Sequence, residues 1–261
     1  MKRILRLKAA AGAGMLLAFL AGQTWAADRV FQMAAQPDLK PDLAAMPQIA
    51  GPVDDAERRI NAALKRLDGN VRKAARSCQA DGGARSAWTR TIRTPMRGPR
   101  FLSVAISDDM FCGGAHPSTG LMAIVYDQTT GLPVDWTKLL PPALTGTVAL
   151  SEGIDGTKMV TLASKRLHAL YRERYRPTSG DAKRDRDDDA CRTVVQDTSM
   201  GDPPGMMAWL DAKAGGLAVQ FDLPHYAQAC ADTVVIPNAV LRREGAQPVL
   251  TDAIEAAHAT P

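Results

Sequence analysis

The fold of this protein is decided by residues 86–112, which read SAWTRTIRTPMRGPRFLSVAISDDMFC. Within this stretch Leu102, Val104 and Ile106 alternate with small or polar residues, which is the pattern of a strand with one buried face. Residues 86–96 and 100–111 are two strand-like runs of similar length, joined near Arg97-Gly98. They therefore predict an antiparallel hairpin.

The segments around this hairpin predict an α+β protein, with antiparallel hairpins in a sheet that packs against two or three helices. A helix is expected from Asp54, which resembles a capping-box residue with Glu57, through an apolar stripe that ends near Ala75. Asp68-Gly69-Asn70 is a point where this helix could break. Further strands are expected at 121–126, 205–211, 216–222 and 232–236, further helices at 157–174 and 238–243, and a charged, solvated loop at 176–190.

The first 26 residues have the composition of a secretory signal peptide. Four of the 32 basic residues lie there and precede an apolar run that is shorter than the roughly 20 residues of a membrane span. A cut after Ala26 leaves 28 basic and 28 acidic residues, so the mature chain is formally neutral and no nucleic-acid partner is expected. We expect a periplasmic or secreted protein without membrane insertion.

The rest of the chain divides into three parts. Residues 27–52 contain four prolines and are predicted to be a linker or extended arm. Residues 53–245 are expected to form a single α+β domain, and residues 246–261 a flexible tail.

The four cysteines all lie in the mature part, and an even count in an exported chain predicts two disulfides. Three pairings are open. Folding the 86–111 hairpin about its turn places Cys112 opposite about residue 83, close to Cys78. This favours Cys78–Cys112 and leaves Cys191–Cys230, so the domain is expected to be disulfide-stapled.

The segment Cys112-Gly113-Gly114-Ala115-His116-Pro117 lies between two predicted strands. Glycine reaches backbone angles that are closed to other residues, so the chain can turn tightly here. His116 is either a loop residue bonded to the backbone or a metal-binding or catalytic group. Because loops on rigid strands often carry recognition, we expect binding residues at Gly113, Gly114, His116 and Pro117, with Tyr226 as a further one.

Enzyme chemistry finds little support in the residue pattern. Ser118 with His116 and Asp108 or Asp109 could form a serine hydrolase set, but the chain has no G-x-S-x-G segment. We therefore predict no catalytic residue.

Metal binding and sugar stacking are also weakly indicated. His116 and His225 are not at the spacing of zinc ligands, and the acidic run 181–189 lacks the Gly and Glu positions of a calcium-binding EF-hand. We predict no metal and no cofactor. Some aromatic side chains could stack on sugars, although most aromatics fill the core; these are Trp88, Trp136, Trp209 and Tyr226.

Two segments of the chain resemble a known family. They are the run from Phe101 to Gly131, which includes Gly113-Gly114-Ala115-His116-Pro117, and the run from Leu217 to Pro237. Both are similar to the family called domain of unknown function 3298, over a core of about residues 80–245. The resemblance implies a compact α+β module outside the cytoplasm, since the family includes the lysozyme-sensing domain of an anti-sigma factor and modules beside cell-wall deacetylases.

The residues and the resemblance together predict an exported, non-enzymatic binding protein of the cell envelope. Its partner is expected to be a lysozyme-like hydrolase, another envelope protein or peptidoglycan. The alternative is a hydrolase or deacetylase that acts on the cell wall with a site near His116. Loss of turnover on His116→Ala, with folding intact, separates the two.

Overall fold

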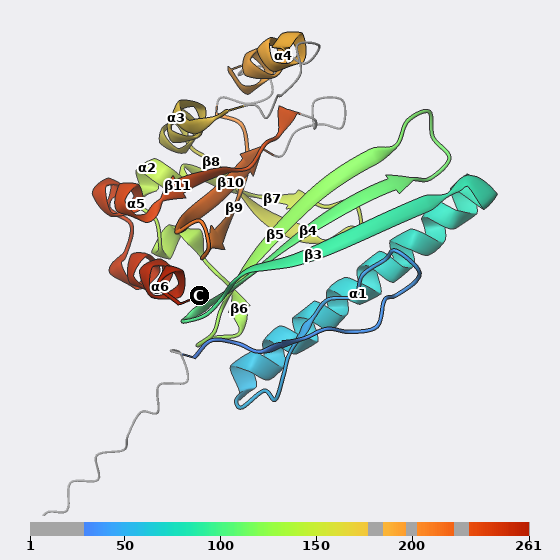
Figure 1. Ribbon diagram of the computed structural model, residues 1–261, viewed down its shortest axis with the longest axis horizontal. Coiled ribbons are helices and arrows are strands. Elements are labelled where there is room, and N and C mark those ends of the chain that lie inside the picture. The colour runs from blue at the N-terminus through green and yellow to red at the C-terminus, as the bar shows by residue number, and fades with distance from the viewer. Residues whose placement is uncertain (1–28, 177–184, 197–202, 222–229, 261) are drawn as a thin grey trace, which may run out of the picture.

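The computed structural model describes residues 29–176, 185–196, 203–221 and 230–260, so the predicted signal peptide lies outside the described residues (Figure 1). The strands are β1 Met33–Ala34, β2 Gln48–Ile49, β3 Ala87–Arg97, β4 Phe101–Phe111, β5 Ser118–Asp127, β6 Leu132–Pro133, β7 Thr147–Glu152, β8 Lys158–Ala163, β9 Met206–Asp211, β10 Gly216–Phe221 and β11 Val234–Pro237. The α-helices are α1 Asp55–Gly82, α2 Pro142–Thr145, α3 Lys165–Arg174, α4 Asp185–Gln196, α5 Asn238–Glu244 and α6 Pro248–His258.

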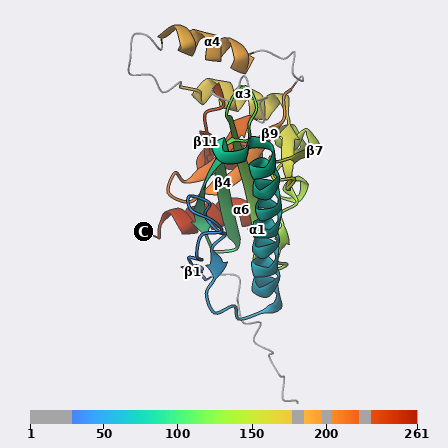
Figure 2. The same ribbon diagram turned by 90° about the vertical axis from the view of Figure 1, so that its right-hand side faces the viewer.

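Two sheets form the centre of the molecule. The four-stranded sheet has the order β3-β4-β5-β6 and the five-stranded sheet the order β11-β10-β9-β8-β7, with all neighbours antiparallel. They meet where the buried Ser103 Oγ of β4 accepts a hydrogen bond from the Leu210 amide of β9, at 2.9 Å. Helix α1 lies along the four-stranded sheet, and α3, α5 and α6 lie beside the five-stranded sheet (Figures 1 and 2). The predicted disulfide-stapled α+β class is confirmed.

Helix α1 begins where the capping signal predicts. The Asp54 carboxylate accepts a hydrogen bond from the Glu57 amide at 2.8 Å, and a stripe from Ile60 to Cys78 is buried. The expected break near Asp68 is wrong, since the helix runs on to Gly82. Asp68 accepts a bond from the Met46 amide and Asn70 donates to Thr157, so both side chains bind neighbouring segments and do not compete for their own backbone.

The described part of the predicted linker is packed into the protein. Phe31, Leu43, Met46 and Ile49 are all buried, and the Arg90 amide of β3 donates a hydrogen bond to the Asp42 carbonyl. The prolines of this arm keep it out of a helix, but they leave its large apolar side chains free to pack against α1 and the sheet. Phe31 and the segment 43–49 therefore contribute to the core, while most of residues 32–42 are exposed.

The predicted flexible tail is also wrong for most of its length. Residues 248–258 form α6, with Leu250, Ala253, Ile254 and Ala257 buried. These positions have helical spacing, and Pro248 at the first turn suits a helix start.

The expected helix at 157–174 is a strand followed by a helix. Residues 158–163 form β8, and the Ser164 side chain caps α3 by accepting the Leu167 amide. Part of the expected loop at 176–190 belongs to α4, which Cys191–Cys230 ties to the segment before β11. In the ranges that the structure describes, no helix has the length and hydropathy needed to cross a bilayer.

Candidate functional site

The segment 112–117 connects β4 to β5 at the end of the long hairpin, away from α5 and α6 (Figure 1). Four of the predicted binding residues, Gly113, Gly114, His116 and Pro117, lie together here, and all are exposed. We call residues 113–117 the tip. The fifth, Tyr226, lies outside the described residues, as does His225.

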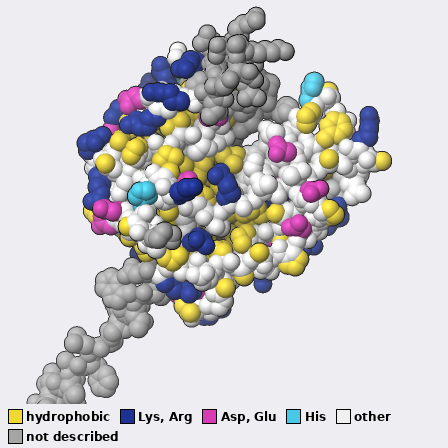
Figure 3. All heavy atoms as spheres, in the orientation of Figure 1, with side chains coloured by type: hydrophobic (Ala, Val, Ile, Leu, Met, Phe, Trp, Pro, Cys, Tyr) yellow, Lys and Arg dark blue, Asp and Glu magenta, His cyan; other side chains and the backbone are white. Residues whose placement is uncertain are grey.

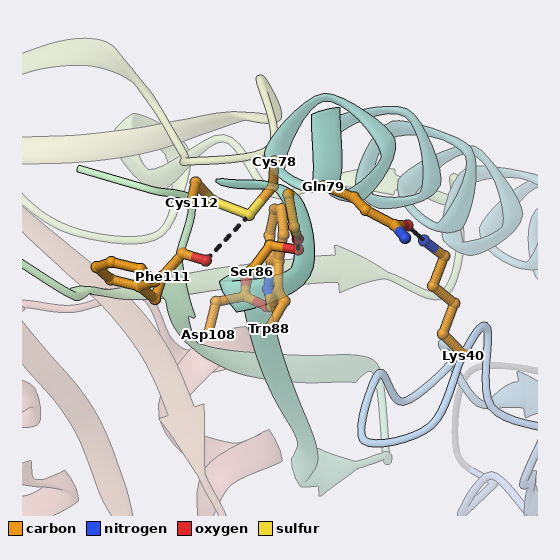
Figure 4. Close-up of a disulfide and its surroundings, with 9 residues drawn as sticks. Lys40, Cys78, Gln79, Ser86, Trp88, Asp108, Phe111 and Cys112 are labelled. Atoms are coloured by element: carbon orange, nitrogen blue, oxygen red, sulfur yellow. Dashed lines mark hydrogen bonds between the residues drawn. A yellow bond between two sulfur atoms is a disulfide. The ribbon is translucent and has the colours of Figure 1, made fainter. Parts of the chain in front are cut away.

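The tip is fastened at its base to the end of α1. Both predicted disulfides form, and Cys78–Cys112 brings the two Cα atoms to 4.6 Å (Figure 4). Beside this disulfide the backbones of Gly82 and Gly113 touch: a Cβ on Gly113 would lie 2.7 Å from the Gly82 Cα. Gly113 also has a φ of +86°, which side chains rarely allow. The disulfide and the glycine contact therefore hold the start of the tip against the helix.

A buried group of charges lies behind the tip, on the face of the sheet that α1 covers. The Arg90 Nε of β3 lies 3.6 Å from Asp108 Oδ1 of β4, and its Nη2 lies 3.6 Å from Asp155 Oδ2 of the β7–β8 turn. Trp88 Nε1 donates a 2.8 Å hydrogen bond to Asp108 Oδ1. We call Trp88, Arg90, Asp108 and Asp155 the buried polar cluster. It joins both sheets.

The three charged side chains of the buried polar cluster are shielded from solvent. The Arg90 side chain is fully buried, as is that of Asp155. Burial raises the pKa of the Asp108 carboxyl, and the Arg90 guanidinium and the Trp88 hydrogen bond oppose that rise. The Asp155 carboxylate also accepts the Thr157 amide at 2.9 Å, which shapes the turn. A buried cation between two carboxylates stabilises the fold only while all three remain.

This cluster is not among the sites predicted from the sequence, although one signal for it is present. Arg90 and Asp108 face each other in the β3–β4 register, as a cross-strand pair of opposite charge. Asp155 has no such local signal, since tertiary folding brings it to Arg90.

A surface cleft of about 340 Å³ opens next to the disulfide, between the N-terminal arm, α1 and β3. Trp88 is partly exposed at its wall, and Lys40 Nζ donates to Gln79 Oε1 at 3.1 Å across it (Figure 4). Polar and aromatic residues in its lining include Lys40, Asp42, Gln79, Ser86 and Trp88. One partly exposed indole among polar groups suits a ring-shaped polar ligand.

The opposite face of the same strands is polar and exposed. Thr89, Asp109 and Thr119 are aligned across β3, β4 and β5, with Thr91 of the next row also exposed. In the view of Figure 3 this end of the molecule carries few charged side chains, and they are of both signs. The tip is thus flanked by the cleft on one face of the hairpin and by a threonine-rich surface on the other.

The residues considered for a hydrolase site, a metal site and sugar stacking are also located by the structure. Asp108 is buried and bound to Trp88, and it faces away from Asp109, so the two do not act together beside His116. In the described ranges, no group of three or more His, Cys, Asp or Glu side chains is placed to hold a metal ion. Trp136 and Trp209 are buried in the core, which leaves Trp88 as the described tryptophan at a cleft.

Comparison with known proteins finds similar solved structures. Neither a model of a known protein family nor a curated protein matches the chain. A crystal structure from Bacteroides fragilis is 11% identical, with 79% of this chain and 75% of that protein covered at a TM-score of 0.43. One from Pseudomonas aeruginosa is 12% identical, with 85% and 94% covered at a TM-score of 0.46. Both are structures of DUF3298 family members, the family that the segments 101–131 and 217–237 resemble.

Proposed function

We propose that this chain is an exported binding protein of the cell envelope, which docks its partner with the tip and does not transform it. One observation carries the proposal: an exposed loop with four of the predicted binding residues stands on a disulfide and a backbone contact that fix its base. A loop that is ordered before binding loses less conformational entropy when it docks, so such a tip favours recognition.

The surroundings of the tip support an envelope partner. A protein partner would cover the tip together with the threonine-rich surface, whose exposed hydroxyls supply hydrogen bonds without strong charge. A glycan would reach the cleft, where the Trp88 ring and the side chains of Lys40, Gln79 and Ser86 line one wall. The lysozyme-like hydrolase and peptidoglycan of the sequence prediction differ in which of these two surfaces they need.

The decisive experiment uses the oxidised chain from residue 27 onward. Binding to purified peptidoglycan is measured by co-sedimentation, and binding to a lysozyme by biolayer interferometry. Ala115→Arg places a long cation on the exposed tip, and we expect it to weaken binding at least tenfold, because an unmatched charge must be desolvated. Val53→Arg is the control, since Val53 is exposed before the start of α1, at the other end of that helix from the tip.

A second variant separates the partners. Lys40→Ala with Gln79→Ala opens the cleft without touching the tip, and it should weaken glycan binding while leaving lysozyme binding intact. If neither partner binds, or if Ala115→Arg binds both as well as the native chain, the proposal fails. Turnover of peptidoglycan that is lost in His116→Ala, with an unchanged unfolding transition, would establish the hydrolase or deacetylase alternative instead.

A further inference from the structure

Strand β7 forms one edge of the five-stranded sheet and is exposed along most of its length. Its sequence from Thr147 to Ser151 carries no charge, and Glu152 at its end pairs with Lys158 of β8. Leu150 is 70% exposed and Val148 is 42% exposed, on the same face of the strand because they are two residues apart. β7 lies at the outer margin of the molecule (Figure 2).

The free backbone groups of β7 can be assigned from its turn. Gly153 donates its amide to the Thr157 carbonyl at 2.8 Å, so the backbone of Gly153 points toward β8. Backbone direction alternates along an antiparallel strand. In the register of β7 with β8, residues 147, 149 and 151 therefore bond to β8, while the amides and carbonyls of Val148, Leu150 and Glu152 point outward.

The other long sheet edges are protected in ways that β7 is not. Strand β3 carries Pro95, several arginines and a register irregularity between Arg93 and Met96. Strand β11 ends in Pro237 and packs against α3 and α5. Proline, inward or outward charge, bulges and covering helices are the common means by which proteins prevent edge pairing. Among the residues that the structure describes, no proline, charge, bulge or covering helix protects β7 from Thr147 to Leu150.

We propose that β7 is a self-association edge, which pairs antiparallel with β7 of a second copy about a two-fold axis at Ala149. In this register Val148 of each copy lies opposite Leu150 of the other, in a hydrogen-bonded pair, so the exposed apolar side chains cover one another. Glu152 lies opposite Gly146 of the other copy, so no like charges meet. An axis one residue further along, at Leu150, would set Glu152 against Val148.

A second copy fits this edge because the pairing is self-complementary. In a two-fold interface each copy contributes the same surface, so β7 of one copy lies beside β7 of the other. Because this strand carries no charge from Thr147 to Ser151, the pairing brings no like charges together. The paired edges join two five-stranded sheets into one continuous sheet. Because one strand from each copy makes a small interface, the dimer forms in a concentration-dependent equilibrium.

Sedimentation velocity on the oxidised chain from residue 27, over a wide concentration range, tests the proposal. The weight-average mass should rise from monomer toward dimer. Val148→Lys should weaken dimerisation at least tenfold, and Leu150→Pro should abolish it, because proline removes an outward amide that β8 does not use. Val249→Lys is the matched control, since Val249 is also 42% exposed but lies on α6.

The proposed register of the β7–β7 pair can be tested separately by disulfide cross-linking. Across the two-fold axis the Ala149 Cα atoms of a non-hydrogen-bonded pair lie about 4.5 Å apart, within reach of a disulfide. Ala149→Cys should therefore form a covalent dimer under mild oxidation, and Thr147→Cys should not. A chain that stays monomeric at all concentrations, association that Val148→Lys leaves unchanged, or efficient cross-linking through Thr147→Cys would each overturn the proposal.

Discussion

The β4–β5 hairpin and the β7–β8 hairpin both project from the centre of the molecule, but they are held in opposite ways. Strand β4 is buried over most of its length between α1 and the second sheet, and a disulfide holds the hairpin at its tip. Strand β7 is exposed over most of its length; it pairs with β8 on one side, and its turn is held where Asp155 meets Arg90. The first hairpin therefore presents a loop that is held at its base, and the second presents an exposed strand edge.

This difference shows how one fold can offer two kinds of surface. A loop on a fixed base is suited to a partner of defined shape, whereas an open edge is suited to another strand. The buried polar cluster joins the two hairpins, because Arg90 of the adjoining strand β3 lies between Asp108 of the first hairpin and Asp155 of the second. Substitutions in each hairpin should therefore reveal how much of the stability each one carries.

The largest effect is expected from Arg90→Met. Removing the guanidinium leaves the Asp108 and Asp155 carboxylates buried without their cation, which should cost about 3–5 kcal/mol of unfolding free energy at neutral pH. Burial already raises the pKa of Asp108, and losing Arg90 raises it further. A carboxyl with a raised folded-state pKa stabilises the protein below its unfolded pKa and loses that effect as pH rises. The loss of unfolding free energy caused by Arg90→Met should therefore become smaller as pH falls from about 7 to about 4.

The control for this prediction is Arg93→Met, on the same strand but exposed. It should change the unfolding free energy by no more than about 0.5 kcal/mol at any pH in this range. Urea unfolding of both variants and the native chain at several pH values gives the measurement. A deficit in Arg90→Met that is constant with pH would contradict the role assigned to the carboxylates.

The next effect concerns the base of the tip. Replacing Cys78 and Cys112 together by Ala should lower the unfolding free energy by about 2–4 kcal/mol, because the link no longer restricts the unfolded chain. Amide hydrogen exchange at residues 112–118 should also become faster. Replacing Cys191 and Cys230 in the same way is the comparison, and it should leave exchange at the tip unchanged. Equal acceleration in both variants would show that Cys78–Cys112 does not specifically hold the tip.

A smaller and more local effect is expected from Gly113→Ala. The residue has a positive φ, and its new Cβ would press against Gly82, so the variant should lose about 1–3 kcal/mol. Gly114→Ala is a matched control, since its φ is not positive and no atom lies closer than 4.0 Å to the added Cβ. Thermal unfolding of both variants tests the pair. Equal losses would contradict the close contact between the tip and α1.

The β3–β4 hairpin, whose second strand leads into the tip, could largely be predicted from sequence because its signals are local. Alternating residues from Leu102 to Ser107 and the turn near Gly98 define a hairpin, and its register carries Cys112 to Cys78. The same register places Arg90 opposite Asp108, so half of the buried polar cluster was within reach of the sequence. Asp155 was not, because its contact with Arg90 depends on how two distant hairpins pack.

The β7–β8 region was mispredicted because its pattern fits two structures. Val160, Ala163, Leu167 and Leu170 have helical spacing by coincidence, since the first two belong to β8 and the others to α3. Ser164, which caps α3, marks the boundary. Strand β7 has exposed apolar residues on one face and small residues on the other, so it gives no strong alternation.

The smallest effect is expected from Leu150→Ala on β7. Leu150 is 70% exposed, so the truncation should change the unfolding free energy of the monomer by no more than about 0.5 kcal/mol. The same substitution at the fully buried Leu102 of β4 should cost about 2–5 kcal/mol, because it removes buried methyl groups and leaves a cavity. Both are measured by urea unfolding at a protein concentration where the native chain is monomeric. If Leu150→Ala costs as much as Leu102→Ala, then β7 is covered in the folded monomer, and the contrast between the two hairpins is wrong.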